Sequence, residues 1–406
     1  MSTKPDRKRS EAPDSGPATG LVALGVTLAL QVFTSLAATA TSVLAPEIGP
    51  AVGLPPKLIG VFVGLVYLGS MFASLGAGGF IERYGSIRVS QVCVLVCACG
   101  LALVCGPWWS LALAPLLIGL GYGPITAASS HLLARTTPPH RLALTFSIKQ
   151  TGVPLGAALA GAIMPVLALA FGWRSALLAI VAAGFAIAVS AQPTRASLDS
   201  DRSERASFSL RGLFAPLRLI VGNPTLIELS LTGFFYAATQ MCLMSFLVVY
   251  LTEALQRPLV WAGLALTVTN VGGIIGRIVW GGVADRWIAP RRLLGIIGVV
   301  AGACSLATAA FSSSLSSPLL LAVCAIFGAS AIGWNGVQLS EVARNAPAGQ
   351  AGAVTGASGF ITFSGVMLGP PLFAAMAALT ETYRIGFAFF GITSIACGAW
   401  LVSRKL

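Results

Sequence analysis

Twelve predominantly apolar stretches follow one another along the 406-residue chain, each about long enough to cross a membrane. A helix needs about 20 apolar residues to cover roughly 30 Å of hydrocarbon at about 1.5 Å per residue. Only 9% of the residues are charged, against about a quarter in a soluble protein. We therefore expect an all-α integral membrane protein with transmembrane helices at residues 21–44, 58–79, 89–106, 111–131, 142–168, 173–191, 226–250, 261–283, 293–311, 319–339, 352–378 and 385–402.

Two polar segments divide the chain into domains. Residues 1–19 form a basic tail that we expect to be disordered, and the apolar run after it exceeds the 7–15 residues, roughly, of a signal-peptide core. Residues 192–222 are rich in charge and predict a linker, with a short amphipathic helix at 208–219 on the membrane surface. The expected domains are therefore six-helix bundles at residues 20–191 and 223–406.

The positions of lysine and arginine predict the orientation. Most of them lie in the tail, the linker and the loops on that same side, whereas Lys57, Arg174, Arg257 and Arg384 lie on the other. By the positive-inside rule, both termini and the linker are cytoplasmic. We expect a multi-pass protein of the bacterial cytoplasmic (inner) membrane, with the lipid bilayer and not nucleic acid as its partner. The placement of the +12 formal charge along the loops matters more than its sum.

A charged, glycine-containing hairpin joins the second and third apolar runs, and a second copy joins the eighth and ninth. The first contains Gly78, Glu82, Arg83, Gly85 and Arg88, and the second contains Gly281, Asp285 and Arg286. Glycine, acid and arginine recur at one offset, which indicates an internal duplication. Because glycine lets helix ends approach closely and an acid beside an arginine can change partners, we expect each hairpin to act as a conformational latch.

With these hairpins, the six-plus-six helices and the central linker, the chain resembles the major facilitator superfamily. The family hairpin reads Gly-x-x-x-Asp-Arg-x-Gly-x-Arg; here Glu82 replaces the aspartate of the first copy, and Ile288 replaces the later glycine of the second. The resemblance implies two pseudo-symmetric six-helix bundles and a secondary transporter that works by alternating access. We expect a monomer without a cofactor or metal; a proton or an exchanged anion as coupled species stays open.

Two cations lie far inside the predicted helices, where an ionisable group costs about 2.5–3.5 kcal/mol to insert. Lys149 and Arg277 are at similar depth in the fifth and eighth helices, one in each half. A guanidinium binds a carboxylate through two hydrogen bonds, and a lysine adds a compact second charge. Arg277 also resembles the eighth-helix arginine of the oxalate:formate antiporter and monocarboxylate carriers, which binds a substrate carboxylate. The alternative is that Arg277 pairs with Asp285 or Glu341 and braces the hairpin.

Other polar and aromatic residues in the helices are candidates for the wall of a central cavity. We expect Gln31, Tyr122, Gln150, Asn270, Trp334 and Asn335 to shape the substrate pocket, and Thr34, Ser35, Tyr67, Gln240 and Gln338 are further candidates. Each could instead form a hydrogen bond between helices, which is common in membrane proteins.

The expected function is transport of a small organic anion, in particular a carboxylate, because no acid lies deep in the helices to favour a cation. The alternative is efflux of hydrophobic drugs or metabolites. We do not expect an enzyme: the 2 histidines lie near one cytoplasmic turn, and the 8 cysteines lie in apolar runs, with no metal-ligand spacing. A phosphate-binding Gly-x-x-x-x-Gly-Lys-Ser/Thr run is also missing.

Overall fold

The computed structural model describes residues 17–53, 59–107, 109–203, 214–312 and 314–403. These residues are helical or lie in turns and contain twelve helical segments long and apolar enough to cross a membrane, so the predicted fold class is confirmed. The expected tail at residues 1–16 and residues 204–213 of the expected linker lie outside the described part of the chain.

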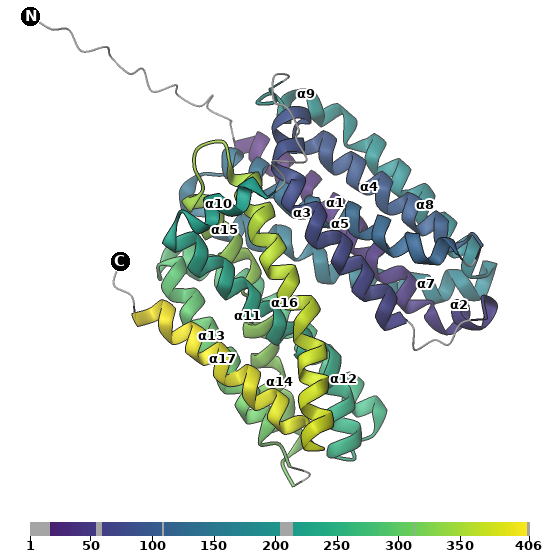
Figure 1. Cartoon of the computed structure of the whole chain (residues 1–406), viewed down its shortest axis with the longest axis vertical. Helices are drawn as coiled ribbons and strands as arrows, with labels where there is room; N and C mark the ends of the chain where they lie inside the picture. Colours follow the sequence, from purple (N-terminus) through teal and green to yellow (C-terminus); the bar gives the residue numbers. More distant parts are fainter. Residues whose placement is uncertain (1–16, 54–58, 108, 204–213, 313, 404–406) are drawn as a thin grey trace, which may run out of the picture.

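The first half of the chain forms one six-helix bundle, drawn in purple to teal in Figure 1. Its long helices are α1 (Pro17–Val43), α3 (Ile59–Tyr84), α4 (Ser86–Val104), α5 (Ser110–Thr136), α6 (Leu142–Gln150) continued by α7 (Gly152–Phe171), and α8 (Trp173–Ser190), with the short α2 (Ala45–Ala51) and α9 (Arg195–Leu198) beside them. Its apolar core is one continuous cluster that includes Leu30, Ile118 and Met164.

The second half forms the other bundle, drawn in green to yellow. Its helices are α11 (Pro224–Val249), α12 (Leu259–Arg286), α13 (Pro290–Ala309), α14 (Ser317–Ala331) followed by α15 (Asn335–Asn345), α16 (Ala351–Thr380) and α17 (Tyr383–Ser403), preceded by the short α10 (Ala215–Val221). The expected surface helix at 208–219 is represented among the described residues by α10, which begins later and ends at Val221.

Two apolar runs that we expected to form single helices are interrupted. The run at 142–168 is divided at Thr151 between α6 and α7, close to Pro154, and the run at 319–339 is divided between α14 and α15. Proline has no N–H, so Pro154 cannot bond the carbonyl four residues earlier, which belongs to Gln150. Both interruptions leave backbone carbonyls available inside the protein.

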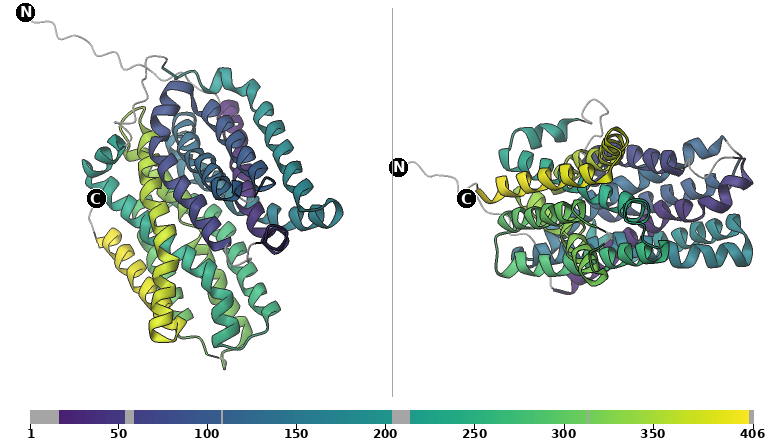
Figure 2. Two further views of the ribbon diagram at one scale, coloured as in Figure 1. Left: turned by 45° about the vertical axis from the view of Figure 1, so that its right-hand side comes forward. Right: turned by 90° about the horizontal axis from the view of Figure 1, so that it is seen from below.

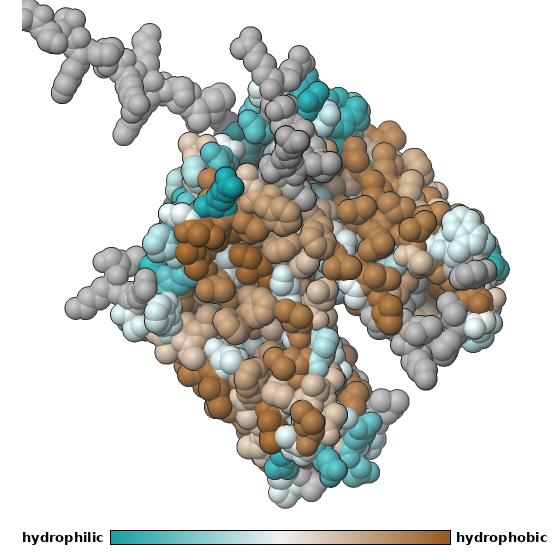
Figure 3. Space-filling view, in the orientation of Figure 1, coloured by the Kyte–Doolittle hydropathy of each residue, from teal (hydrophilic) through white to brown (hydrophobic). Residues whose placement is uncertain are grey.

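The bundles touch at the end that carries α9 and α10, which we call the closed end, and diverge toward the opposite, open end (Figures 1 and 2). Figure 3 shows the gap between them at the open end. At the closed end small residues let the backbones approach: a Cβ on Gly78 would collide with Ala353, and one on Gly281 would collide with Ser147. These contacts join α3 to α16 and α12 to α6.

Candidate substrate site between the two bundles

A cavity at mid-depth lies between the bundles and has two adjoining parts. The inner part, of about 120 Å³, reaches Ser74 and Thr355, which lie four residues from Gly78 and two residues from Ala353 at the closed end. The outer part, of about 270 Å³, reaches Ser42 and Val63 near the open end. Six residues line both parts: Tyr67, Tyr122, Val153, Gln240, Met241 and Arg277. A cavity of this kind has room for a small organic molecule.

Arg277 lies where the two parts of the cavity meet. Its side chain is 2% exposed, and its Nε donates a hydrogen bond to the carbonyl of Ile332 at 3.0 Å while Nη1 donates to the carbonyl of Gln150. These two carbonyls belong to the helix interruptions, one in each bundle, so their usual helical donors are displaced. Since a guanidinium has five N–H groups, three remain beyond these two bonds, and the side chain lines the cavity.

Lys149 is not among the residues that line the cavity; it contacts Gln150, which does line it. The ammonium is 1% exposed and donates to Gln31 Oε1 at 2.7 Å and to Gln150 Oε1 at 3.0 Å. Gln150 therefore contacts both cations, Lys149 through its side chain and Arg277 through its carbonyl. Within the described part of the chain, neither cation has a carboxylate within ion-pair distance.

The alternative partners proposed for Arg277 are engaged elsewhere. Asp285 pairs with Arg344 at 3.6 Å, and Glu341 pairs with the same arginine at 3.3 Å. The expectation that Arg277 could brace the second hairpin through an ion pair with either acid is therefore wrong for this structure. The reason is geometric, because Arg277 turns toward the helix interruptions and not along α12 toward its end.

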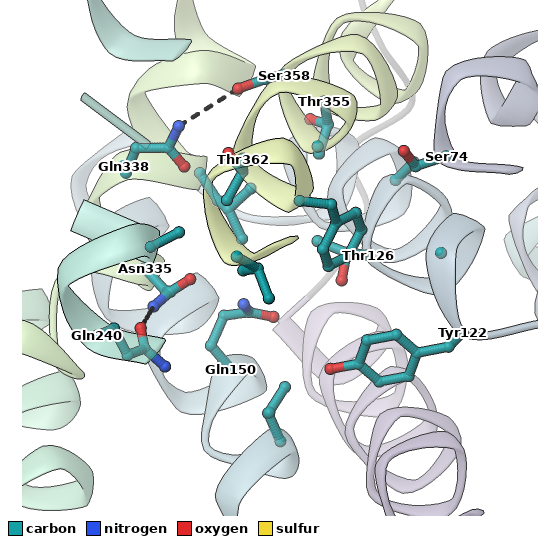
Figure 4. A pocket seen from close by; sticks show the side chains of 18 of the residues that line it. Ser74, Tyr122, Thr126, Gln150, Gln240, Asn335, Gln338, Thr355, Ser358 and Thr362 are labelled. Carbon is teal, nitrogen blue, oxygen red and sulfur yellow. Dashed lines mark hydrogen bonds between the residues drawn. The ribbon is translucent and has the colours of Figure 1, made fainter. Parts of the chain in front are cut away.

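The other predicted pocket residues occupy different places. Tyr122, Gln150, Trp334 and Asn335 line the inner part, and Asn270 lines the outer part, where its amide donates to the carbonyl of Leu266 in its own helix. Figure 4 shows Asn335 directed at Gln240, with Nδ2 to Oε1 at 3.2 Å. Gln31 is not among the residues that line either part and instead holds Lys149.

Several polar residues of the inner part were not predicted from the sequence. They are Ser74, Thr126, Thr355, Ser358 and Thr362, which Figure 4 shows around the cavity. The three on α16 are separated by three and four residues, which places them on one face of that helix. This spacing of hydroxyl groups in an otherwise apolar helix is the signal that could have identified them.

The two hairpins differ in what their carboxylates contact. Asp285 accepts hydrogen bonds from the N–H groups of Ala143 at 3.0 Å and Leu144 at 2.7 Å, at the first turn of α6 in the other bundle. Glu82 is exposed. The first turn of α4 is capped instead by Asp199, which accepts from Ile87 N–H at 2.8 Å and Arg88 N–H at 3.0 Å.

Comparison with known proteins agrees with this architecture. The model of the Major Facilitator Superfamily matches residues 27–370. The chain is 29% identical to the gallate transporter of Pseudomonas putida, with 68% of each chain covered. It is 28% identical to the hexuronate transporter of Bacillus subtilis over 154 residues, which span 37% of this chain and 36% of that relative. Among solved structures, the transporter FucP in its outward conformation matches 95% of this chain and 100% of its own with a TM-score of 0.74 at 18% identity.

The family match extends over most of the chain, and the fold of the twelve apolar helices is similar to that of a solved transporter. The chain therefore belongs to the Major Facilitator Superfamily and is a multi-pass membrane transporter, not an enzyme.

Proposed function

We propose that the protein is a secondary active transporter that moves a small organic anion, in particular a carboxylate, by alternating access. The observation that carries this proposal is the Arg277 guanidinium, which lies in the wall shared by both parts of the cavity without a carboxylate partner among the described residues. A substrate carboxylate would accept two parallel hydrogen bonds from its remaining N–H groups. Such a partner also offsets the cost of keeping a cation away from water.

The electrostatic character of the cavity supports an anion over a cation. No aspartate or glutamate occurs among the described residues that line either part. Lys149 adds a second positive charge behind Gln150 and can polarise that amide toward the substrate. The names of two relatives, a gallate and a hexuronate transporter, denote organic acids and support the same class.

The transport cycle follows from the arrangement of the bundles. We propose that residues 20–191 and 223–406 move as two bodies about the cavity, with both termini in the cytoplasm and the protein in the cytoplasmic membrane. The closed end is then the cytoplasmic end, and the cavity opens outward in this structure. Rocking about the site would separate the contacts of Gly78 and Gly281 and bring the open ends together.

The experiment is counterflow of labelled organic acids into proteoliposomes that contain the wild type, Arg277→Gln or Arg277→Lys. We expect Arg277→Gln to lower uptake by about 10- to 100-fold, because a charge-assisted hydrogen bond contributes roughly 1.5–3 kcal/mol. Arg277→Lys keeps the charge but not the fork and should recover only part of the uptake. Arg174→Gln, at an exposed arginine outside the cavity, is the matched control.

Full uptake of acids by Arg277→Gln would contradict the proposal. If that variant instead exported uncharged hydrophobic compounds at the wild-type rate, efflux of drugs or metabolites would replace anion transport as the function. Omitting a pH gradient and varying the internal anion in the same vesicles separates proton coupling from exchange.

A further inference from the structure

The two parts of the cavity differ in chemistry. Beyond the shared residues, the wall of the outer part is more apolar: it includes Val63, Ala157 and Met244, and its polar residues are Ser35, Thr39, Ser42 and Asn270. The inner part is lined by hydroxyl and amide groups from four helices, which Figure 4 shows around one space: Ser74, Thr126, Gln338, Thr355, Ser358 and Thr362. Arg277 can bind a substrate carboxylate through its own N–H groups. Carboxylate binding therefore does not explain why the inner part is lined by hydroxyl and amide groups.

Thr355 distinguishes the inner part from ordinary helix contacts. Its side chain is 2% exposed and lines the cavity, yet its Oγ1 has no hydrogen-bond partner in the described protein. The neighbouring Ser358 hydroxyl, in contrast, accepts from Gln338 at 3.3 Å and from Ser230 at 3.2 Å. A buried hydroxyl without a partner costs about 1–3 kcal/mol, so a group on the cavity wall in this state is suited to a partner supplied by a ligand.

The spacing of the hydroxyl groups on α16 indicates how far the inner part extends along that helix. Thr362 and Thr355 are seven residues apart, which corresponds to about 10 Å along the helix at about 1.5 Å per residue. Thr362 is adjacent to Phe363, whose ring lies 6.1 Å from that of Tyr67 and 6.2 Å from that of Tyr122. Both tyrosines share the wall with Arg277. Arg277, the aromatic rings and the threonines therefore follow one another toward the closed end.

This order matches one class of ligand. An acid with its carboxylate at Arg277 would lay the face of its carbon frame against the rings and extend its hydroxyl groups toward Thr362 and Thr355. We propose that the inner part is a hydroxyl-recognising subsite and that the substrate is a hydroxylated organic acid, bound through Arg277 at one end and through the Thr355 hydroxyl at the other. This inference rests on the proposed function, because it needs the carboxylate at Arg277.

Two kinds of acid share this chemistry, and the test separates them. Binding is measured on the full chain in lipid nanodiscs by titration calorimetry with gallate against benzoate, and with galacturonate against hexanoate. Each pair compares a hydroxylated acid with one that has no hydroxyl groups. The proteins are the wild type, Thr355→Val, Thr355→Ser and Arg277→Gln, with Thr267→Val at an exposed threonine of α12 as the control.

We expect at least one hydroxylated acid to bind the wild type at least tenfold more tightly than its hydroxyl-free counterpart. Thr355→Val should weaken binding of that acid by about five- to tenfold and leave the counterpart unchanged, and Thr355→Ser should restore it. A response with gallate alone assigns an aromatic acid, and a response with galacturonate alone assigns a sugar acid. Arg277→Gln should weaken the binding of all acids that bind.

Three results would overturn the subsite: equal affinity within both pairs, an equal loss for both members of a pair in Thr355→Val, or no loss in that variant. If Thr355→Val does not fold, Thr362→Val replaces it, with the same criteria. These failures are distinct from failure of the proposed function, which would show as unchanged acid binding in Arg277→Gln whatever the threonine variants do.

Discussion

The two hairpins share a sequence pattern but join different parts of the molecule. In the second, Asp285 lies in the last turn of α12 and accepts hydrogen bonds from the first turn of α6, in the other bundle. In the first, Glu82 is exposed, and the carboxylate at the start of α4 is that of Asp199, from the same half of the chain. Each arrangement places a negative charge at the positive end of a helix. The contact of Asp285 holds the two bundles together, whereas the contact of Asp199 fixes the linker to the first bundle.

The two hairpins nevertheless share the close packing of a glycine against the opposite bundle. A Cβ on Gly78 would collide with Ala353 of the opposite bundle, and one on Gly281 would collide with Ser147 of the opposite bundle. The duplication has therefore preserved close backbone approach at both positions but not the charged contact. We propose that Asp285 makes the second hairpin an electrostatic latch of the closed end and that Gly78 of the first hairpin contributes to closure through packing.

The largest effect is expected from Gly85→Ala in the first hairpin. Gly85 has φ of 90° and ψ of 158°, a backbone region open almost only to glycine, and a Cβ there would collide with Asp199. Strain and loss of the α4 cap should lower the free energy of unfolding by about 3 kcal/mol. The measurement is thermal unfolding in detergent with refolding controls.

Gly282→Ala is the matched control in the second hairpin. Gly282 lies within α12, and a Cβ there meets nothing within 4 Å. Alanine is favoured over glycine inside a helix by roughly 1 kcal/mol, so this variant should be as stable as the wild type or slightly more stable. Equal losses in the two variants would show that the first hairpin is not specially constrained by Asp199.

A smaller effect, on conformation and not on folding, is expected from Asp285→Ala. The change removes the acceptor of two N–H groups on α6, in the opposite bundle, and the partner of Arg344 on α15, in the same bundle as Asp285. It should disfavour closure of this end by about 2 kcal/mol, a shift of roughly 30-fold in the conformational equilibrium. Hydrogen exchange measured by mass spectrometry should show faster exchange in α6 and in the start of α16.

Glu82→Ala sharpens the comparison, because Glu82 occupies the position of Asp285 in the first hairpin. Its side chain is exposed. The free energy of opening at the closed end, measured by hydrogen exchange, should therefore change by less than a few tenths of a kcal/mol. An equal increase in exchange for both variants would mean that the two latches are electrostatically equivalent and that the contrast is limited to this conformation.

The sequence predicted the helices and hairpins well because membrane burial imposes a length and a polarity that can be read locally. It also selected Arg277, Gln150 and Asn335 as polar residues within apolar helices, and the structure places all three at the cavity. The interruption at Thr151 was less visible, since a proline near the start of α7 can bend a helix or divide it.

What could not be predicted depends on contacts between distant segments. Asp199 lies in the expected linker, and nothing in its neighbourhood indicates that it caps α4, 111 residues away at Arg88. Thr355 was overlooked because threonine is common in membrane helices, where its hydroxyl usually bonds to its own backbone. Only the structure shows that this hydroxyl lacks such a bond.

An effect smaller than those of Gly85→Ala and Asp285→Ala concerns the charge of Asp199, which faces the N–H groups of α4, Arg195 at 3.9 Å and the nearby Asp201. Burial raises the pKa of this carboxyl despite the two hydrogen bonds that favour its ionised form. Asp199→Asn removes the titration and one acceptor oxygen, and should cost about 1 kcal/mol near neutral pH.

The sign of the pH dependence follows from this raised pKa. A raised pKa in the folded state means that the stabilising contribution of Asp199 is complete below its unfolded pKa, about 3.9, and is lost as the pH rises through the folded value. The stability difference between the wild type and Asp199→Asn should therefore widen as the pH falls from 7 toward 5. A difference for Asp199→Asn that narrowed toward low pH would contradict this expectation and would mean that the cap depends on the ionised carboxylate.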